Sequence, residues 1–221
     1  MRNRAPFKFL KIVVKLKARR KLNLFMELYN EKFSEIASDT FSLRKRMHTR
    51  KIIELIQPRE NDVILDVGCN QGELVQLLRN FTQTAYGCDI NEEAIKNSDV
   101  DGLKIMSADK LEYDDNSFDK IVSSHVVEHI LDLKKTLEEI KRVLKPSGIC
   151  ALLYPFEIFR GSNNLIESWR VFGNPLYSRR LHIRKLCPKK IKKFTDMKII
   201  DDGMFFGPYP TYFTVLKKDL D

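Results

Sequence analysis

The sequence predicts an α/β fold with a sheet of seven mostly parallel strands, helices on both faces and an antiparallel hairpin at the end. Two observations carry this prediction. Between residues 63 and 154, short apolar segments of strand length alternate with segments of helical periodicity. Two further strand-like segments, 197–201 and 211–217, then follow with no helix between them. Such a pair cannot form a right-handed parallel crossover, so one of its strands must run antiparallel.

Each element has its own local signals. We expect strands at 63–67, 84–88, 103–107, 119–124, 149–154, 197–201 and 211–217. We expect helices at 22–36, 44–56, 73–80, 92–97, 132–144 and 189–194. The strongest helix begins at Asp132, a good N-cap, and has Leu133, Leu137 and Ile140 at helical spacing. Residues 145–148, Lys-Pro-Ser-Gly, should end it and form a turn. A Gly- and Pro-rich turn should separate the last two strands.

Length and composition indicate one globular domain with a short extension. The chain has 221 residues, 43% of them hydrophobic, and its longest apolar runs are of strand length. No stretch approaches the roughly 20 apolar residues that cross a bilayer. The cysteines have no C-x-x-C spacing, and three of the four fall in or beside predicted strands. Buried free thiols of this kind indicate a reducing compartment, so we expect a cytoplasmic protein.

Charge is concentrated at the N-terminus. The net charge is +9, and residues 1–21 hold nine Lys and Arg and no acidic residue. Residues 7–20 read as an amphipathic helix that could lie on an anionic membrane surface, giving peripheral contact at the inner membrane face. They could equally pack as a lid on the domain or on a second subunit. A secretory signal is disfavoured because Lys11 and Lys15 interrupt the apolar core.

We divide the chain into this extension, 1–43, and a main domain, 44–221. A second basic cluster, 179–193, is most simply a solvated face.

The segment 64–72 carries most of the functional information. An apolar strand runs into Asp66, and a tight turn with Gly68 and Gly72 leads into a helix. Glycine suits a sharp bend or a ligand against the backbone, and the first amides of a helix point outward toward a polar group. Asp89 ends the next strand, 23 residues after Asp66. A carboxylate there suits the two hydroxyls of a ribose, which indicates a nucleoside-cofactor site.

The glycine pattern distinguishes between cofactors. Dinucleotide folds usually show Gly-x-Gly-x-x-Gly, whereas here the pattern is Asp66-x-Gly68-x-x-x-Gly72. An acidic residue before the turn suits a ligand that carries an ammonium or a sulfonium. At these residues the chain resembles the class I methyltransferases that use S-adenosylmethionine, within the type 11 small-molecule group, over roughly residues 44–217. That family usually has a further glycine where Asn70 stands, and Asn tolerates the left-handed conformation. The resemblance implies a Rossmann-like sheet.

The resemblance also implies roles for individual residues. Asp66 and Gly68, with Asn70 and Gly72 in the same turn, would hold the amino-acid end of S-adenosylmethionine. Asp89 would bind the ribose and Ile90 would pack on the adenine. Asp109 would accept from the adenine amino group, with Lys110 beside it and Ser124 at the tip of the fourth strand. Any one of these aspartates could instead be a helix cap or a turn residue; all three at strand tips favour the cofactor site.

The string His125-x-x-Glu128-His129 matches an inverted zinc-peptidase pattern. Zinc would need a longer helix and a third ligand elsewhere, and His48 and His182 are the remaining imidazoles. We therefore expect no metal site, and a Glu-His pair that packs or faces the substrate, as the resemblance implies. A hydroxyl acceptor would need a general base, for which His125, His129 and His182 are the candidates.

The acceptor is expected to be a small molecule, a lipid or a glycan precursor. The aromatic segment 155–182 interrupts the alternation of strands and helices, where the family places an insertion that covers the acceptor; packing over the sheet edge is the alternative. Nucleic acid is disfavoured because residues 123–125 are not an N/D-P-P-Y motif and no Pro-Cys nucleophile exists. The expected reaction is direct in-line displacement on oxygen, nitrogen or carbon. The alternatives are a catalytically silent binding module, an RNA-directed methyltransferase held by phosphate contacts and, least favoured, an NAD-dependent oxidoreductase.

Overall fold

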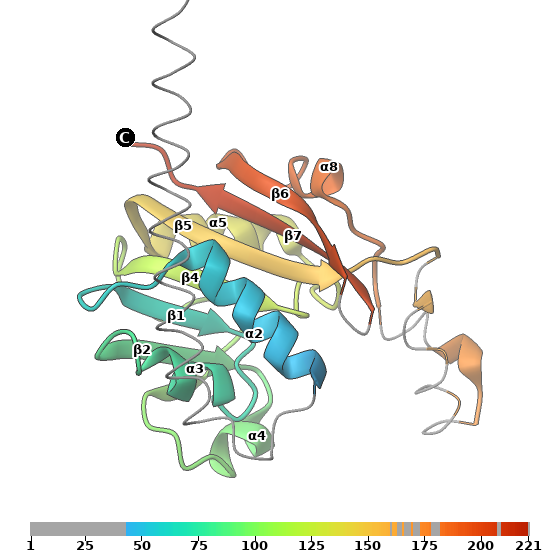
Figure 1. The fold of residues 1–221 in the computed structure, drawn as a ribbon, viewed down its shortest axis with the longest axis horizontal. Helices are drawn as coiled ribbons and strands as arrows, with labels where there is room; N and C mark the ends of the chain where they lie inside the picture. The colour runs from blue at the N-terminus through green and yellow to red at the C-terminus, as the bar shows by residue number, and fades with distance from the viewer. Residues whose placement is uncertain are drawn as a thin grey trace, which may run out of the picture. The chain divides into compact units, whose positions relative to one another are not determined.

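Seven strands form one sheet in the order β3-β2-β1-β4-β5-β7-β6 (Figure 1). The computed structural model describes residues 43–159, 161–162, 165, 169, 173–177, 182–206 and 209–220. The strands are β1 (Val63–Val67), β2 (Thr84–Asp89), β3 (Leu103–Ile105), β4 (Phe118–Ser124), β5 (Leu144–Pro155), β6 (Lys198–Phe206) and β7 (Pro210–Lys217). The first five pair in parallel, and β7 runs antiparallel to both β5 and β6. The predicted sheet with its terminal antiparallel hairpin is confirmed.

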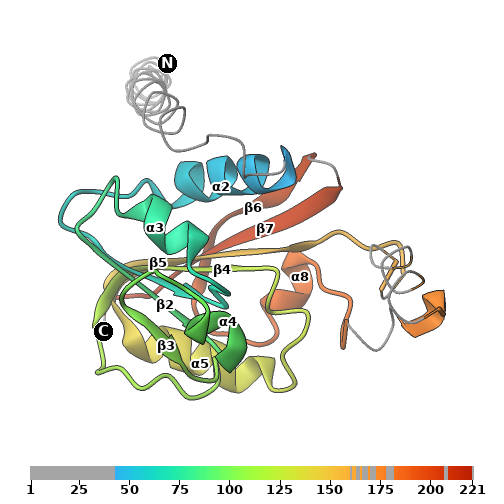
Figure 2. The same cartoon turned by 90° about the horizontal axis from the view of Figure 1, so that it is seen from below.

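Helices cover both faces of this sheet. They are α2 (Leu43–Ile56), α3 (Glu73–Leu78), α4 (Glu92–Lys96), α5 (Leu133–Val143) and α8 (Pro188–Ile191), with a 3-10 turn, η2, at Pro175–Tyr177. Figure 2 shows α2 and α3 on one face of the sheet and α5 and α8 on the other. Because both faces are covered, β1 and β4 are buried along most of their length rather than at every second residue.

Helix α5 shows how the sequence fixes local structure and packing together. The Asp132 side chain accepts a hydrogen bond from the Lys135 backbone N–H at 3.0 Å, which caps the first turn. From there Leu133, Leu137 and Ile140 recur on one face and are fully buried in the main core, against side chains of β4 and β5. The helix therefore begins where its cap predicts and lies with its apolar stripe on the sheet.

The structure corrects two predicted turns. Residues 145–148 were expected to be a turn before a strand at 149, but β5 begins at Leu144, directly after α5. Leu144 is fully buried and pairs with Phe118, and the register shift before the Lys120–Ile149 pair absorbs the irregular residues as a bulge. The turn expected after residue 201 is also displaced, because β6 continues to Phe206. Gly203 sits within that strand, where a Cβ would lie 2.9 Å from the Phe213 ring.

Several sequence predictions lie outside the described residues. These are the amphipathic helix at 7–20, the helix at 22–36 and 13 of the 28 residues of the segment 155–182. The expected contact of residues 1–21 with an anionic membrane therefore stays a prediction, as does the division of the chain at residue 43. Among the helices that are described, none has both the length and the apolar character needed to cross a membrane.

The packing of α5 predicts a large cost for truncating Leu137. Its side chain is 0% exposed, so Leu137→Ala should remove about 2–5 kcal/mol from the free energy of unfolding through lost burial and a residual cavity. The matched control is Lys134→Ala on the outer face of the same helix, expected to change stability by less than about 0.5 kcal/mol. Urea unfolding measures both. Equal effects of the two substitutions would contradict this packing.

Candidate functional site

The carboxyl ends of the parallel strands surround a cavity of about 660 Å³, here called the strand-tip cavity. A cavity in this place is expected, because ligands of open α/β sheets bind outside the carboxyl ends of the strands. Its lining comes from four strand tips and the start of α5: Val67, Gly68, Asn70, Cys88, Asp89, Ile90, Met106, Ser107, Ala108, Asp109, Ser124, His125, Val126, His129, Ile130, Leu131, Asp132 and Thr136. Most of the predicted cofactor residues therefore meet at one place.

The turn after β1 has the backbone that its sequence predicts. Gly68, Asn70 and Gly72 have φ angles of +85°, +50° and +78°, so Asn70 adopts the left-handed conformation where the family usually has glycine. The backbone N–H groups of Gly68 and Cys69 donate to the Cys88 carbonyl at 2.7 and 3.0 Å. A Cβ on Gly68 would lie 2.1 Å from Val126 Cγ2, so only glycine fits at this point of the lining.

Asp89 ties this turn to the tip of β2. Its Oδ2 accepts the backbone N–H of Asn70 and its Oδ1 accepts that of Asn91, both at 2.8 Å. Each carboxylate oxygen can accept a further hydrogen bond, and Asp89 lines the cavity. One side chain therefore both shapes the turn and offers charged acceptors to a ligand.

Asp66 lies at the end of β1, beneath the cavity rather than in its lining. The residue is 3% exposed, and its burial, together with the nearby charge of Asp89, raises the pKa of the carboxyl to about 7. A carboxyl with this pKa is about half ionised at neutral pH, and a cation beside it would favour the charged form. The paired carboxyls of Asp66 and Asp89 thus make this end of the cavity suitable for a positively charged group.

The remaining predicted cofactor residues divide into two groups. Ile90 lines the cavity with 74% of its surface exposed, and Ser124 lines it from β4. Asp109 also lines it; a hydrogen bond from Ser107 Oγ and the ammonium of Lys135 at 3.5 Å hold the pKa of its carboxyl low. Lys110 and Gly72 are not in the lining. A Cβ on Gly72 would lie 2.7 Å from the Leu103 side chain, so this glycine allows packing of the turn.

The cavity also has apolar residues that the sequence analysis did not single out. They are Met106 and Ala108 after β3, and Ile130 and Leu131 after β4, and Leu131 is 82% exposed. Their signal in the sequence was their position just after a strand end, which is where ligands contact such sheets. An apolar wall facing charged carboxylates is the combination that orients a nucleoside.

Three histidines gather around one buried carboxylate next to the cavity. His125, with φ of +58°, and His129 both line the cavity, and their Nδ1 and Nε2 atoms lie 3.4 and 4.0 Å from Glu128 Oε1. His182 is buried outside the lining, with its ring 4.9 Å from the His129 ring. Its Nδ1 lies 2.7 Å from Glu157 Oε1. His125 and His129 can therefore reach a ligand directly, and His182 cannot do so in this conformation.

The thiols near the cavity are poor nucleophiles. Burial, and then the charge of Asp66, raises the pKa of the Cys88 thiol to about 12, and burial raises the pKa of Cys69 as well. Because the thiolate is the reactive form, neither cysteine is suited to covalent catalysis near neutral pH.

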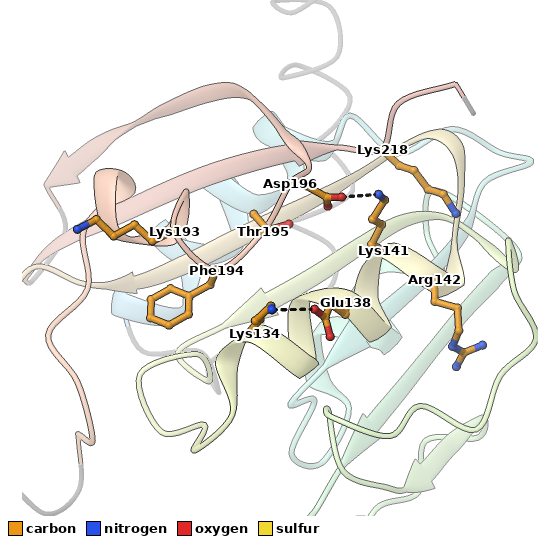
Figure 3. A pocket seen from close by; sticks show the side chains of 9 residues that line it. All are labelled: Lys134, Glu138, Lys141, Arg142, Lys193, Phe194, Thr195, Asp196 and Lys218. Carbon is orange, nitrogen blue, oxygen red and sulfur yellow. Dashed lines mark hydrogen bonds and ion pairs between the residues drawn. The ribbon is translucent and has the colours of Figure 1, made fainter.

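A second cavity, of about 580 Å³, lies between α5 and the segment from α8 to β6 (Figure 3). Its surface is rich in lysine, and two of these lysines form ion pairs: Lys134 with Glu138 at 3.8 Å and Lys141 with Asp196 at 2.8 Å. Lys218 donates to the Asn116 side chain at 2.8 Å. None of its residues lines the strand-tip cavity, and we interpret it as a solvated charged surface.

Comparison with known proteins assigns a class to this fold and site. Residues 65–152 match the family described as "Methyltransferase domain". An uncharacterised protein of Methanocaldococcus jannaschii, MJ1252, is 30% identical over 188 residues, covering 79% of this chain and 73% of that protein. The solved structure of YcgJ from Bacillus subtilis superposes with a TM-score of 0.62 at 15% identity, covering 80% of this chain and 100% of that one.

Two relatives with named activities match smaller parts. Human NDUFAF5, a mitochondrial arginine-hydroxylase, is 37% identical over 97 residues, which cover 42% of this chain and 28% of that protein. UbiE of Hydrogenovibrio crunogenus, a ubiquinone/menaquinone biosynthesis C-methyltransferase, is 32% identical over 128 residues, covering 52% of this chain and 50% of UbiE.

The chain belongs to the class I S-adenosylmethionine-dependent methyltransferases of type 11, as the sequence predicted, and S-adenosylmethionine is its cofactor.

The turn geometry predicts that Gly68→Ala lowers the free energy of unfolding more than Gly173→Ala does. Gly173 also has a left-handed φ, +66°, but no described atom would lie within 4 Å of an added Cβ. Gly173→Ala should therefore cost only about 1–2 kcal/mol, from the backbone alone. Gly68→Ala should cost more, because its Cβ also meets Val126, and should weaken binding of S-adenosylmethionine.

The added Val126→Ala substitution tests the cause. Because it removes the methyl group that the new Cβ would meet, the double variant should recover part of the lost stability in urea unfolding. An equal cost for Gly68→Ala with and without Val126→Ala would show that the close approach is not responsible.

Proposed function

We propose that the strand-tip cavity binds S-adenosylmethionine and presents its methyl group to a small-molecule acceptor. The observation that carries this proposal is the pair of carboxyls, Asp66 and Asp89, at the tips of adjacent strands. A pyrophosphate would be repelled there, whereas an amino acid with a cationic sulfur is attracted. The antiparallel terminal strands and the glycine spacing disfavour the dinucleotide alternative on independent grounds.

The residues proposed for the site suit the cofactor from its amino-acid end, through the ribose, to the adenine. The Gly68 turn and Asp66 suit the amino-acid end, and the carboxylate of Asp89 suits two ribose hydroxyls as charge-assisted acceptors. The exposed face of Ile90, with Met106 and Leu131, suits the flat adenine ring, and Asp109 suits its amino group. The apolar wall on one side and the carboxylates on the other would fix a single orientation of the ligand.

Methyl transfer from S-adenosylmethionine requires few catalytic side chains. When bound, S-adenosylmethionine supplies a methyl group that its sulfonium has already activated for displacement. The protein must then align the acceptor behind that methyl group and keep water away. For a hydroxyl acceptor, His125 or His129 would accept the proton, since both imidazoles line the cavity near Glu128. His182 would act through its neighbours, as it is buried beside Glu157.

The acceptor that fits best is an apolar small molecule. The proposal includes lipid and glycan precursors as acceptors. Ile158 and Trp169, in the segment expected to cover the acceptor, are 77% and 63% exposed. Exposed apolar side chains of this size suit an apolar ligand. The relative UbiE methylates carbon in quinone biosynthesis, which supports an acceptor of this kind. Transfer of labelled methyl from S-adenosylmethionine into lipid, glycan and small-molecule extracts would identify the acceptor.

The role of Asp89 predicts a specific loss of affinity. Asp89→Ala should weaken S-adenosylmethionine binding by about 2–3 kcal/mol, because it removes two charge-assisted hydrogen bonds. Since Asp89 also anchors Asn70 and Asn91, the variant Asp89→Asn should be measured as well; it keeps one carbonyl acceptor and should lose less affinity. Calorimetric titration measures both variants, with Asp219→Ala, an exposed carboxylate elsewhere, as the control.

Two results would refute this assignment. Unchanged affinity of folded Asp89→Ala for S-adenosylmethionine would show that Asp89, at the end of β2, does not bind the ribose. Tight binding of NAD with no binding of S-adenosylmethionine would place the protein outside methyl transfer. Binding of the cofactor without any labelled product across the extracts would favour the catalytically silent module.

A further inference from the structure

The fold brings together three potential metal ligands that are far apart in the sequence. Glu128, His129 and His182 offer ligand atoms that all lie within 4.8 Å of one another. Two of these residues follow β4, and the third precedes α8. A backbone hydrogen bond of 3.0 Å from Ile183 N–H to the Glu128 carbonyl holds the two segments side by side. From the sequence we expected no metal, because zinc would need a longer helix and a third ligand; the fold brings His182, one of the two remaining imidazoles, beside Glu128 and His129.

The carboxyl group of Glu128 is the second observation that points to a bound ion. Its side chain is buried, at 1% exposure, and neither carboxyl oxygen has a hydrogen-bond partner among the described residues. The nearest positive groups would be the imidazoles of His125 and His129, at 3.4 and 4.0 Å. Burying a carboxylate without partners is costly, and a bound metal ion would offset that cost.

His182 is oriented in the way that metal-binding imidazoles usually are. Its Nδ1 lies 2.7 Å from Glu157 Oε1, and both residues are almost completely buried. Glu157 Oε1 also accepts the backbone N–H of Gly161 at 2.7 Å, which fixes the carboxylate. With Nδ1–H donating to a carboxylate, the lone pair of the imidazole is on Nε2. A carboxylate behind a histidine in this way sets the tautomer and raises its basicity as a ligand.

We propose that Glu128, His129 and His182 bind one divalent transition-metal ion, of the type of Zn²⁺, with Glu157 as the positioning residue for His182. Two imidazoles and one carboxylate are a donor set that such ions prefer. Ligand atoms around zinc lie roughly 3.4 Å apart, so small side-chain rotations would complete the site.

The proposed location of the ion would allow it to bind the acceptor. His129 lines the strand-tip cavity, so the positions of the ion that protein does not occupy would face the space beside the cofactor. They would bind an oxygen atom of the acceptor and orient it toward the methyl group. With His129 serving as a ligand, the proton of a hydroxyl acceptor would go to His125 rather than to His129. This last step rests on the proposed function; the metal site itself does not.

The experiment measures Zn²⁺ binding to the full chain. The protein is stripped with a chelator, dialysed and titrated with Zn²⁺ and separately with Mg²⁺, by calorimetry and by metal analysis after gel filtration. We expect one Zn²⁺ per chain, and weaker binding of Mg²⁺ because two of the ligands are imidazoles. Glu128→Gln and His182→Ala should lose stoichiometric Zn²⁺, and Glu157→Gln should weaken binding about 10–100-fold.

The matched control is His48→Gln, a buried imidazole outside the three-residue cluster, which should retain one Zn²⁺. Circular dichroism on every variant separates lost binding from lost folding. Absence of stoichiometric Zn²⁺ in the wild type, or the same affinity in folded Glu128→Gln, would overturn the proposal.

Titration with S-adenosylmethionine in the same samples keeps the two proposals separate. Cofactor binding without Zn²⁺ binding would refute only the metal site. Zn²⁺ binding by a folded protein that does not bind S-adenosylmethionine would refute only the proposed function.

Discussion

The proximity of two carboxyls, Asp66 and Asp89, is the constraint on which the rest of the site depends. Parallel pairing of β1 with β2 places Val67 opposite Cys88, so the two strand tips end together and their aspartates lie close. Asp89 is held by two backbone N–H donors, and Asp66 is buried with a pKa raised to about 7. The protein therefore keeps a partly neutralised acid beneath its cavity, which a cationic ligand would ionise.

This arrangement links stability to binding. The pKa of Asp66 is above its value in the unfolded chain, so the folded protein holds a proton that the unfolded chain releases. The contribution of this group to stability is complete below about pH 4 and is lost as the pH rises to about 7. A bound ammonium or sulfonium would offset that loss. Ionisation of Asp66 is thus unfavourable without a cationic ligand and favoured with one.

Much of the fold could be predicted because its signals are local. The cap at Asp132, the apolar stripe of α5 and the glycine turn after β1 are each encoded within a few residues. The bulge after Leu144 was not predicted, because Pro146 and Gly148 favour a turn, whereas the pairing of Leu144 with Phe118 decides the strand. The extension of β6 through Gly203 depends in the same way on the Phe213 ring of the neighbouring strand.

The meeting of most predicted cofactor residues at one cavity could be expected from the sequence, because the strand tips of a parallel sheet converge by topology. Of those named, Asp66, Gly72 and Lys110 lie outside the cavity lining. The association of Glu128 with His182 and Glu157 was not accessible, since it depends on how two distant segments cross beside the sheet. Local patterns therefore predicted the residues proposed for the cofactor, whereas tertiary packing decides the arrangement proposed for the acceptor side.

The central claim is that binding of the cationic cofactor ionises the buried Asp66 carboxyl. Proton release on cofactor binding tests this claim most directly. Calorimetric titration with S-adenosylmethionine at pH 6.5, in buffers of different ionisation enthalpy, gives the number of protons exchanged. With its pKa at about 7, Asp66 is about three-quarters protonated at this pH, so the wild type should release most of one proton per site. Asp66→Asn should bind without this release. Binding to the wild type with no proton release, or equal release from Asp66→Asn, would contradict the account.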